Sequence, residues 1–171
     1  MSGEGKTMSS AVTVFKGNNA KEELIQLVSF NLDREEYGIE VLKVREIIRM
    51  TTITQMPSTP HYVEGIINLR GKVIPIVSLR KKFGLMDSGT GIHTRIMVTD
   101  IDGELMGFIV DSVSEVIRIS SSEIQPAPSM VGGGIDQECI AGVINQAERL
   151  LVLLDMDRLF SPEEKMLFTQ M

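Results

Sequence analysis

The chain has 171 residues, a formal net charge of -6, 43% hydrophobic residues and a single cysteine. This length suffices for one medium domain or two small ones, and the acidic balance argues against nucleic-acid binding, which needs a concentrated basic surface. A lone Cys139 cannot form an intrachain disulfide, and neither a signal-peptide pattern nor a membrane-length apolar run is present. We therefore expect a cytoplasmic globular protein.

The first 21 residues are expected to form a flexible tail. Residues 1–21 mix Gly, Ser, Thr, Asn and Lys without a sustained apolar period, so they offer little surface to bury against the cost of ordering the chain. A short apolar patch at 11–15 fits a docking strand as the alternative, and we favour the flexible tail.

Short β-type segments separated by turn signals dominate the chain from Leu24 onward. The first half predicts strands over 24–32, 37–39, 66–70 and 72–78, a hairpin turn at Arg70-Gly71 and one helical turn over 79–83. The apolar spacing of 41–49 fits either a helical turn or a bulged strand.

The second half predicts a similar series of elements. Strands are expected over 95–100, 104–111, 113–119, 140–145 and 149–155, with a hairpin turn at Asp102-Gly103 and a closing turn over 156–160. Residues 132–134, three glycines, fall in a loop. The sequence Ser161-Pro162-Glu163-Glu164 then predicts a short terminal helix with Ser161 as its N-cap.

The second half in fact repeats the first in order. Gly65-Ile66-Ile67-Asn68 recurs as Gly142-Val143-Ile144-Asn145, an offset of 77 from position 65 to position 142. An earlier block recurs at an offset of 69, from Gly38 to Gly107. Two copies of one element order imply two similar subdomains with a cleft between them, and short turn-separated strands indicate small antiparallel barrels.

No catalytic or metal-binding constellation is evident. His61 and His93 have no other histidine or cysteine at ligand spacing, and Cys139 adjoins an apolar run with no obvious base, which is typical of a packed small hydrophobe. The three glycines at 132–134 lack the Lys-Ser/Thr of a phosphate loop. We expect no enzyme, no metal and no cofactor.

Two stretches contain residues that solubility and core packing do not fully explain. Arg70 lies at the tip of an apolar hairpin, where it is either a solvated turn residue or a planar donor aimed at a partner. The second copy has residues 146–148 there, without an Arg, so the fold does not demand it. Residues 44–50 interleave apolar and charged positions, which fits either core with a rim or an exposed strip that receives another protein.

The stretches 36–48 and 63–80 resemble the CheW family of bacterial chemotaxis coupling proteins. The most specific part is Gly65-Ile66-Ile67-Asn68-Leu69-Arg70-Gly71 with Pro75 behind it, and Ser78 departs from the Asp or Asn often found in relatives. The resemblance covers 22–168. It implies a mainly β fold of two packed SH3-like five-stranded barrels with short helices and a C-terminal helix, intertwined over about 22–85 and 92–160, the chain crossing between them at the ends.

The resemblance also implies a function and its sites. The chain would be a non-catalytic adaptor that joins chemoreceptor cytoplasmic tips to the histidine kinase CheA, at receptor arrays on the inner face of the membrane. The receptor would lie in the groove between the barrels, lined by Val44, Glu46, Gly65, Asn68 and Arg70 from the first and by Ile96, Gly107 and Val113 from the second. The regulatory domain of the kinase would dock on the first barrel at Ile48, Met50 and Ile53.

Two alternatives remain at this point. The chain could couple a non-motility chemosensory array, or the cleft could hold a small molecule for a sensor or enzyme, with Cys139 and His93 as weak support. We expect neither nucleic acid nor a small-molecule substrate as a partner, and membrane contact only through the receptors.

Overall fold

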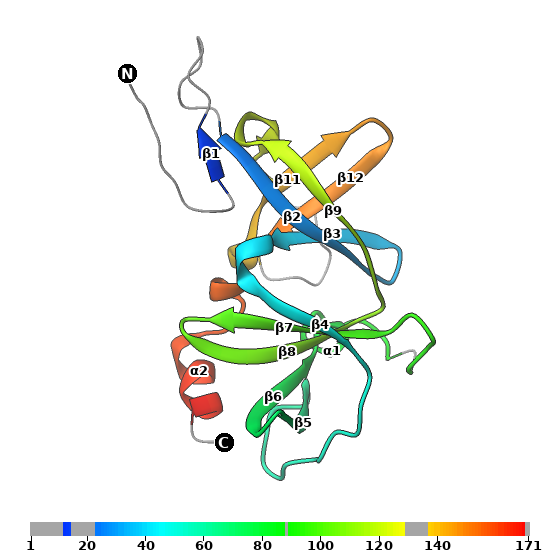
Figure 1. Ribbon diagram of the computed structural model, residues 1–171, viewed down its shortest axis with the longest axis vertical. Coiled ribbons are helices and arrows are strands. Elements are labelled where there is room, and N and C mark those ends of the chain that lie inside the picture. The colour runs from blue at the N-terminus through cyan, green and yellow to red at the C-terminus, as the bar shows by residue number, and fades with distance from the viewer. Residues whose placement is uncertain (1–11, 15–22, 88, 129–136, 170–171) are drawn as a thin grey trace.

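Two β-barrels lie one above the other in the computed structural model, which describes residues 12–14, 23–87, 89–128 and 137–169 (Figure 1). The upper barrel is a sheet of order β1-β2-β3-β12-β11-β10 with β9 also paired to β2, and the lower barrel has order β4-β7-β8-β6-β5. The strands are β1 (Val12–Val14), β2 (Glu23–Leu32), β3 (Glu35–Glu40), β4 (Val44–Arg49), β5 (Val63–Leu69), β6 (Lys72–Ser78), β7 (Arg95–Ile101), β8 (Glu104–Val110), β9 (Ser112–Ser120), β10 (Ile124–Gln125), β11 (Ile140–Gln146) and β12 (Arg149–Leu154). Short helices connect them: η1 (Val41–Lys43), α1 (Leu79–Lys82), η2 (Ser121–Glu123), η3 (Gln137–Cys139), η4 (Met156–Arg158) and α2 (Pro162–Thr169).

The two sequence copies exchange their first hairpins. The β2–β3 hairpin of the first copy pairs with β9 and β12 of the second, while the β7–β8 hairpin of the second copy pairs with β4 and β6 of the first. Each barrel therefore draws strands from both expected ranges, 22–85 and 92–160. The chain crosses between the barrels at 41–43 and at 111, and again after β12, where α2 lies beside the lower barrel (Figure 1).

Turn chemistry places the hairpins where the sequence predicts them. Arg70 and Gly71 have φ values of 52° and 88°, and Asp102 and Gly103 have 51° and 86°, so both turns carry the two positive φ angles that a tight two-residue hairpin needs. Residues 41–49 combine both expected conformations. They begin as the helical turn η1 and continue as β4, whose register shifts between Val44 and Glu46.

Three apolar clusters hold the fold together. Each barrel has its own interior, around Leu27 and Ile144 in the upper one and Ile74 and Ile96 in the lower one. A larger cluster, the shared core, takes side chains from both barrels, including Phe30 of β2 and others from the lower barrel and the C-terminal segment. Burial of one such side chain contributes about 1.5–3 kcal/mol, so the shared core binds the barrels into a single body.

The two ends of the chain dock on different barrels. Val12–Val14 pairs with β2, which is the docking strand considered for the amino end, and the rest of 1–21 lies outside the described residues, as do 132–134. At the other end Ser161 and Glu164 exchange side-chain to backbone hydrogen bonds of 3.1 and 2.8 Å, which confirms Ser161 as the N-cap of α2. Among the described residues, no helix is long and apolar enough to cross a membrane.

Candidate partner-binding surfaces

Glu46 and Arg70 form an ion pair at one end of the lower barrel. Two guanidinium nitrogens of Arg70 donate to the two carboxylate oxygens of Glu46, which joins β4 to the β5–β6 turn. This contact lowers the pKa of Glu46, so the pair stays charged at neutral pH. The Arg70 side chain is nevertheless 70% exposed, and its other N–H donors are accessible to a partner.

The backbone beneath Arg70 is fixed by its neighbours. The Gly71 N–H donates to Asn68 Oδ1 at 2.8 Å, which closes the turn from the inside. Arg70 adopts a left-handed φ of 52°, a conformation that costs a non-glycine residue roughly 1 kcal/mol. Asn68 therefore supports the turn, and the turn aims Arg70 outward.

A hollow of about 480 Å³ opens beside this pair. Its floor is formed by interior side chains of the lower barrel such as Ile74 and Val98, and its rim includes Arg45, Glu46, Arg70 and Asp100. Arg45 donates to Asp100 at 2.6 Å, and this hydrogen bond, together with one from the Gly103 N–H, lowers the pKa of Asp100. The rim is thus a ring of paired charges around an apolar floor, an arrangement suited to binding a protein surface.

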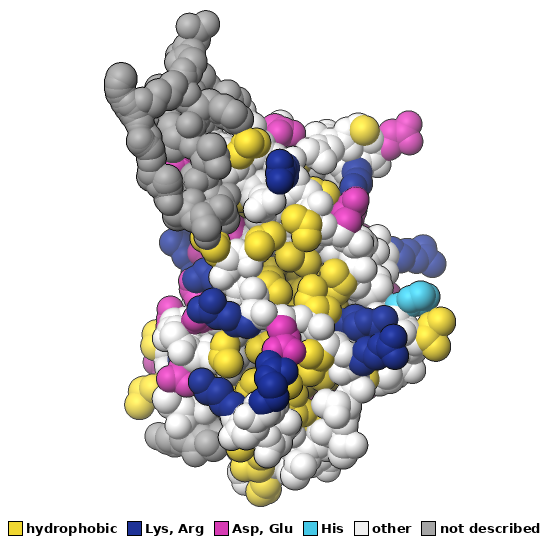
Figure 2. Space-filling model, viewed as in Figure 1, with side chains coloured by type: hydrophobic (Ala, Val, Ile, Leu, Met, Phe, Trp, Pro, Cys, Tyr) yellow, Lys and Arg dark blue, Asp and Glu magenta, His cyan; other side chains and the backbone are white. Residues whose placement is uncertain are grey.

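Val44 and Val113 lie at equivalent positions on the two strands that follow the crossovers. Both are half-buried and pack against the shared core from β4 and β9. Figure 2 shows apolar side chains gathered on the face where β3, β4 and β9 lie, with Lys and Arg side chains on either side below them. Val44 lies on the lower barrel and Val113 on the upper one.

Three of the expected groove residues are buried instead. Ile96 and Gly107 do not face Val44 from the opposite barrel, because the hairpin exchange places β7 and β8 in the same sheet as β4. A Cβ on Gly107 would lie 2.5 Å from Ile76 Cδ1, and one on Gly65, whose φ is 144°, would lie 2.1 Å from the Thr54 carbonyl oxygen. All three support the lower barrel from within.

The residues expected to meet the kinase lie around the lower barrel's outer edge. Ile48, Met50 and Ile53 are half-buried and pack against the barrel interior. Met50 and Ile53 also line a hollow of about 300 Å³ that contains Arg80. Ile47, between them and Val44, is 41% exposed. The structure therefore leaves part of the 44–50 strip on the surface and uses the rest as core.

Two further sets of surface residues were not predicted from the sequence. Exposed apolar side chains recur at equivalent positions of the two copies, Ile47 with Val116 and Val73 with Leu150, and aligning the copies at their offsets would have revealed them. The second set is an ion-pair cluster on the upper barrel, where Arg149 contacts Glu36 at 2.5 Å and Glu115 at 2.7 Å.

The described residues contain no group of three or more His, Cys, Asp or Glu side chains placed to hold a metal ion. Cys139 is buried in the shared core, as its apolar surroundings predict. His61 is exposed and its ring lies 5.6 Å from that of Tyr62. The paired charges and half-buried apolar strands are the features that distinguish the surface.

Comparison with known proteins decides the family. The family model of the CheW-like domain matches residues 26–164. The chain belongs to the CheW family. The chemotaxis protein CheW of Treponema pallidum is 37% identical over 147 residues, which cover 84% of this chain and 86% of that protein, and the CheW of Klebsiella aerogenes is 35% identical over 81% of this chain and 83% of that protein.

A solved CheW structure agrees with this assignment. The scaffolding protein TtCheW from Thermoanaerobacter tengcongensis matches with a TM-score of 0.75 and 36% identity, over 82% of this chain and 90% of that one. The predictions of a CheW-family chain and of a mainly β, two-barrel fold are confirmed. Coupling in chemotaxis is the general role of CheW proteins, and the chain is a chemotaxis coupling adaptor.

Proposed function

We propose that this CheW-family chain is a non-catalytic adaptor that joins the cytoplasmic tips of chemoreceptors to the histidine kinase CheA, in the cytoplasm at receptor arrays. The observation that carries the proposal is the exposed Glu46–Arg70 pair on a hairpin tip of one copy only. The equivalent tip of the other copy has Ala147 at the position of Arg70, with a φ of 50°, so a two-residue hairpin turn forms there without an Arg.

The receptor tip binds along the strands that leave the crossovers. Val44 and Val113 supply half-buried apolar contact, while Glu46 and Arg70 supply charges that recognise polar groups of a helical hairpin. Gly65, Ile96 and Gly107 act beneath this surface by keeping the barrel closed, as their buried positions require.

The kinase binds a separate surface on the lower barrel, at Ile48, Met50 and Ile53. Their partial burial leaves apolar atoms accessible beside the exposed Ile47. Two faces allow two partners to bind at once, and control of the kinase follows from a difference in contact free energy between receptor states. The adaptor itself needs no chemical step.

Replacing Arg70 with alanine tests the receptor surface. In co-sedimentation with vesicles that carry a chemoreceptor cytoplasmic fragment, we expect Arg70→Ala to bind about tenfold more weakly, as for loss of a central interface Arg. Arg158→Ala is the matched control and retains binding, because the Arg158 side chain is 72% exposed, pairs with Asp155 and lies outside β4 and β9. Unfolding curves should be unchanged for both. Undiminished binding by folded Arg70→Ala would refute the assignment.

A further inference from the structure

The two crossovers lie beside α1 and η4, the short helices that follow β6 and β12, because of parallel strand pairing. β3 runs parallel to β12, and β8 runs parallel to β6. The chain that leaves β3 for the lower barrel therefore passes η4, and the chain that leaves β8 for the upper barrel passes α1. Each crossover is held to its neighbouring turn by an ion pair.

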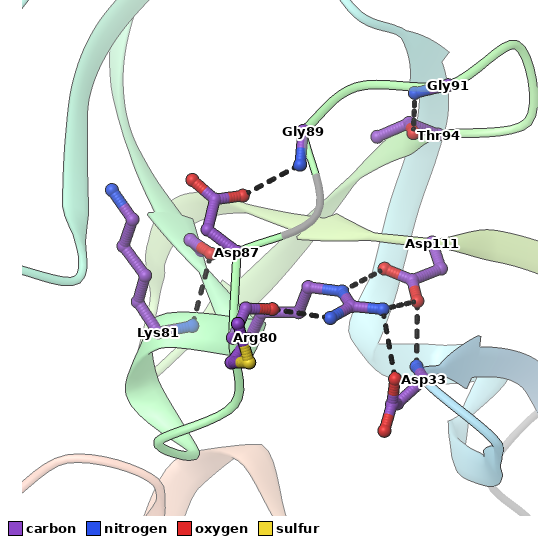
Figure 3. Close-up of polar contacts among 10 residues, drawn as sticks. Asp33, Arg80, Lys81, Asp87, Gly89, Gly91, Thr94 and Asp111 are labelled. Atoms are coloured by element: carbon purple, nitrogen blue, oxygen red, sulfur yellow. Dashed lines mark hydrogen bonds and ion pairs between the residues drawn. The ribbon is translucent and has the colours of Figure 1, made fainter.

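Arg80 of α1 holds the second crossover, as Figure 3 shows. Its Nε and Nη2 donate to the two carboxylate oxygens of Asp111 at 2.8 and 2.7 Å, and its Nη1 donates to the Met86 carbonyl at 2.5 Å. The same Asp111 accepts the Asp33 N–H, from the β2–β3 turn of the upper barrel, at 2.7 Å. One guanidinium that is only 13% exposed thus joins α1, the crossover and the other barrel.

Lys43 and Asp157 hold the first crossover with the charges reversed. Lys43 Nζ contacts Asp157 Oδ2 at 2.5 Å, with side chains that are 39% and 30% exposed. Asp157 is the repeat equivalent of Arg80, an offset of 77 from position 80 to position 157. An ion pair therefore fixes each crossover: a largely buried guanidinium with two hydrogen bonds to Asp111 at the second, and a single, partly buried lysine contact at the first.

The two crossover ion pairs restrain the relative orientation of the barrels, which the shared core does not do by direction-specific contacts. Apolar burial holds the barrels together, but the hydrophobic effect itself is non-directional. A bidentate guanidinium–carboxylate pair fixes both distance and angle. Burial alone would raise the pKa of Asp111, yet the Arg80 contact lowers it overall, so the pair remains ionised.

We propose that Arg80 and, more weakly, Lys43 are positioning residues that set the orientation of one barrel relative to the other, and thereby the relative placement of Val44 and Val113. This inference rests on the proposed function of those two residues in receptor binding. Arg80 acts through the crossover and does not contact the receptor.

Paired substitutions test the inference without leaving a buried charge alone. Arg80→Met with Asp111→Leu removes the stronger ion pair, and Lys43→Met with Asp157→Leu removes the weaker one. Spin labels on Glu104→Cys and Glu148→Cys report the distance between barrels, because both positions are exposed and the native Cys139 is buried. Binding is measured with vesicles that carry the receptor fragment.

We expect the Arg80 pair variant to broaden the distance distribution and to weaken receptor binding about tenfold, within the range of typical coupling between sites. The Lys43 pair variant shifts both readouts less and stays folded because its contact is more exposed. Arg80→Lys keeps the charge but loses the bidentate contact with Asp111. Its distance distribution and its receptor affinity should lie between those of the wild type and the Arg80 pair variant.

An unchanged distance distribution in both pair variants overturns the inference, even if binding falls, because Arg80 would then act by direct contact. A broadened distribution with full binding overturns it as well. If the wild-type chain does not bind the fragment, the proposed function fails instead, and the distance measurement, which needs no partner, still judges the orientation claim.

Discussion

The two barrels use the same acidic position for different purposes. Glu46 of β4 and Glu115 of β9 are equivalent, and each meets an arginine. On the lower barrel the arginine is Arg70, 70% exposed at a hairpin tip, whereas on the upper barrel it is Arg149, 36% exposed at the start of β12. Arg149 also binds Glu36 of β3. One pair therefore ties three strands together, and the other presents its cation to a partner.

The difference indicates how a duplicated fold acquires one binding surface. Both tips are two-residue turns whose first residue is left-handed, since Arg70 and Ala147 have φ values of 52° and 50°, but Gly71 also has a positive φ and Glu148 does not, so a turn forms at this position without an arginine. The function of the tip is thus separable from the stability of the turn.

The largest loss of stability is expected at Gly65, where a side chain would meet the backbone of a neighbouring segment. Gly65→Ala should lower the free energy of unfolding by roughly 3 kcal/mol or more, because its Cβ would lie 2.1 Å from the Thr54 carbonyl at a positive φ. The equivalent Gly142→Ala would place its Cβ 2.6 Å from Ile124 Cγ2 and 2.8 Å from the Gln125 carbonyl oxygen, longer contacts and without a positive φ, so it should cost less. Urea denaturation of both variants measures the order, and a reversed order would show that the copies are not packed as described.

A smaller effect is expected from Arg149→Ala. Loss of charged hydrogen bonds to Glu36 and Glu115 should destabilise the fold by about 1–2 kcal/mol, a value reduced for the partial exposure of the pair. Receptor binding should stay at the wild-type level, in contrast to Arg70→Ala. A variant that unfolds normally but loses receptor binding would mean that the upper cluster is also a partner surface.

The pH dependence sharpens this test. The hydrogen bond from Arg149 holds the pKa of Glu36 below its usual 4.5 despite burial. A depressed carboxyl pKa contributes stability above the unfolded-state value, and this stability is lost as the pH falls through the folded-state value. The stability difference between wild type and Arg149→Ala should therefore be full at pH 7 and shrink below about pH 4.3. A difference that does not change with pH would assign the effect to packing alone.

The smallest effect is expected at the turn of the second copy. Ala147→Gly should raise the free energy of unfolding by about 0.5 kcal/mol, since relief of the positive φ slightly exceeds the added flexibility of the unfolded chain. Thermal unfolding of the variant checks this. A lower melting temperature would indicate that the alanine methyl group contributes packing.

Local signals predicted most of the elements, and long-range pairing was the part they could not supply. The Arg70-Gly71 and Asp102-Gly103 turns and the N-cap Ser161 are predictable from neighbouring residues alone, and the repeat is found by comparing the two halves of the sequence. The repeat offset states which segments are alike but not which of them pair. Because the first hairpins are exchanged, Ile96 and Gly107 were assigned to the wrong barrel.

The contact between Glu46 and Arg70 was likewise not predictable as a pair, although both residues were named. It depends on how β4 and the β5–β6 turn meet across the barrel end. The Arg149 cluster was missed for the same reason, since its carboxylates come from β3 and β9, far away in the sequence.

The hairpin exchange has a consequence for synthesis of the protein. All five strands of the lower barrel come from one uninterrupted stretch, 44–110, whereas the upper barrel combines strands before and after it. A chain that emerges from the ribosome amino end first can close the lower barrel before β9 to β12 have emerged, and β2 and β3 must wait for those strands. The Glu46–Arg70 surface can therefore form early, and the upper barrel is assembled last, beside a barrel already in place.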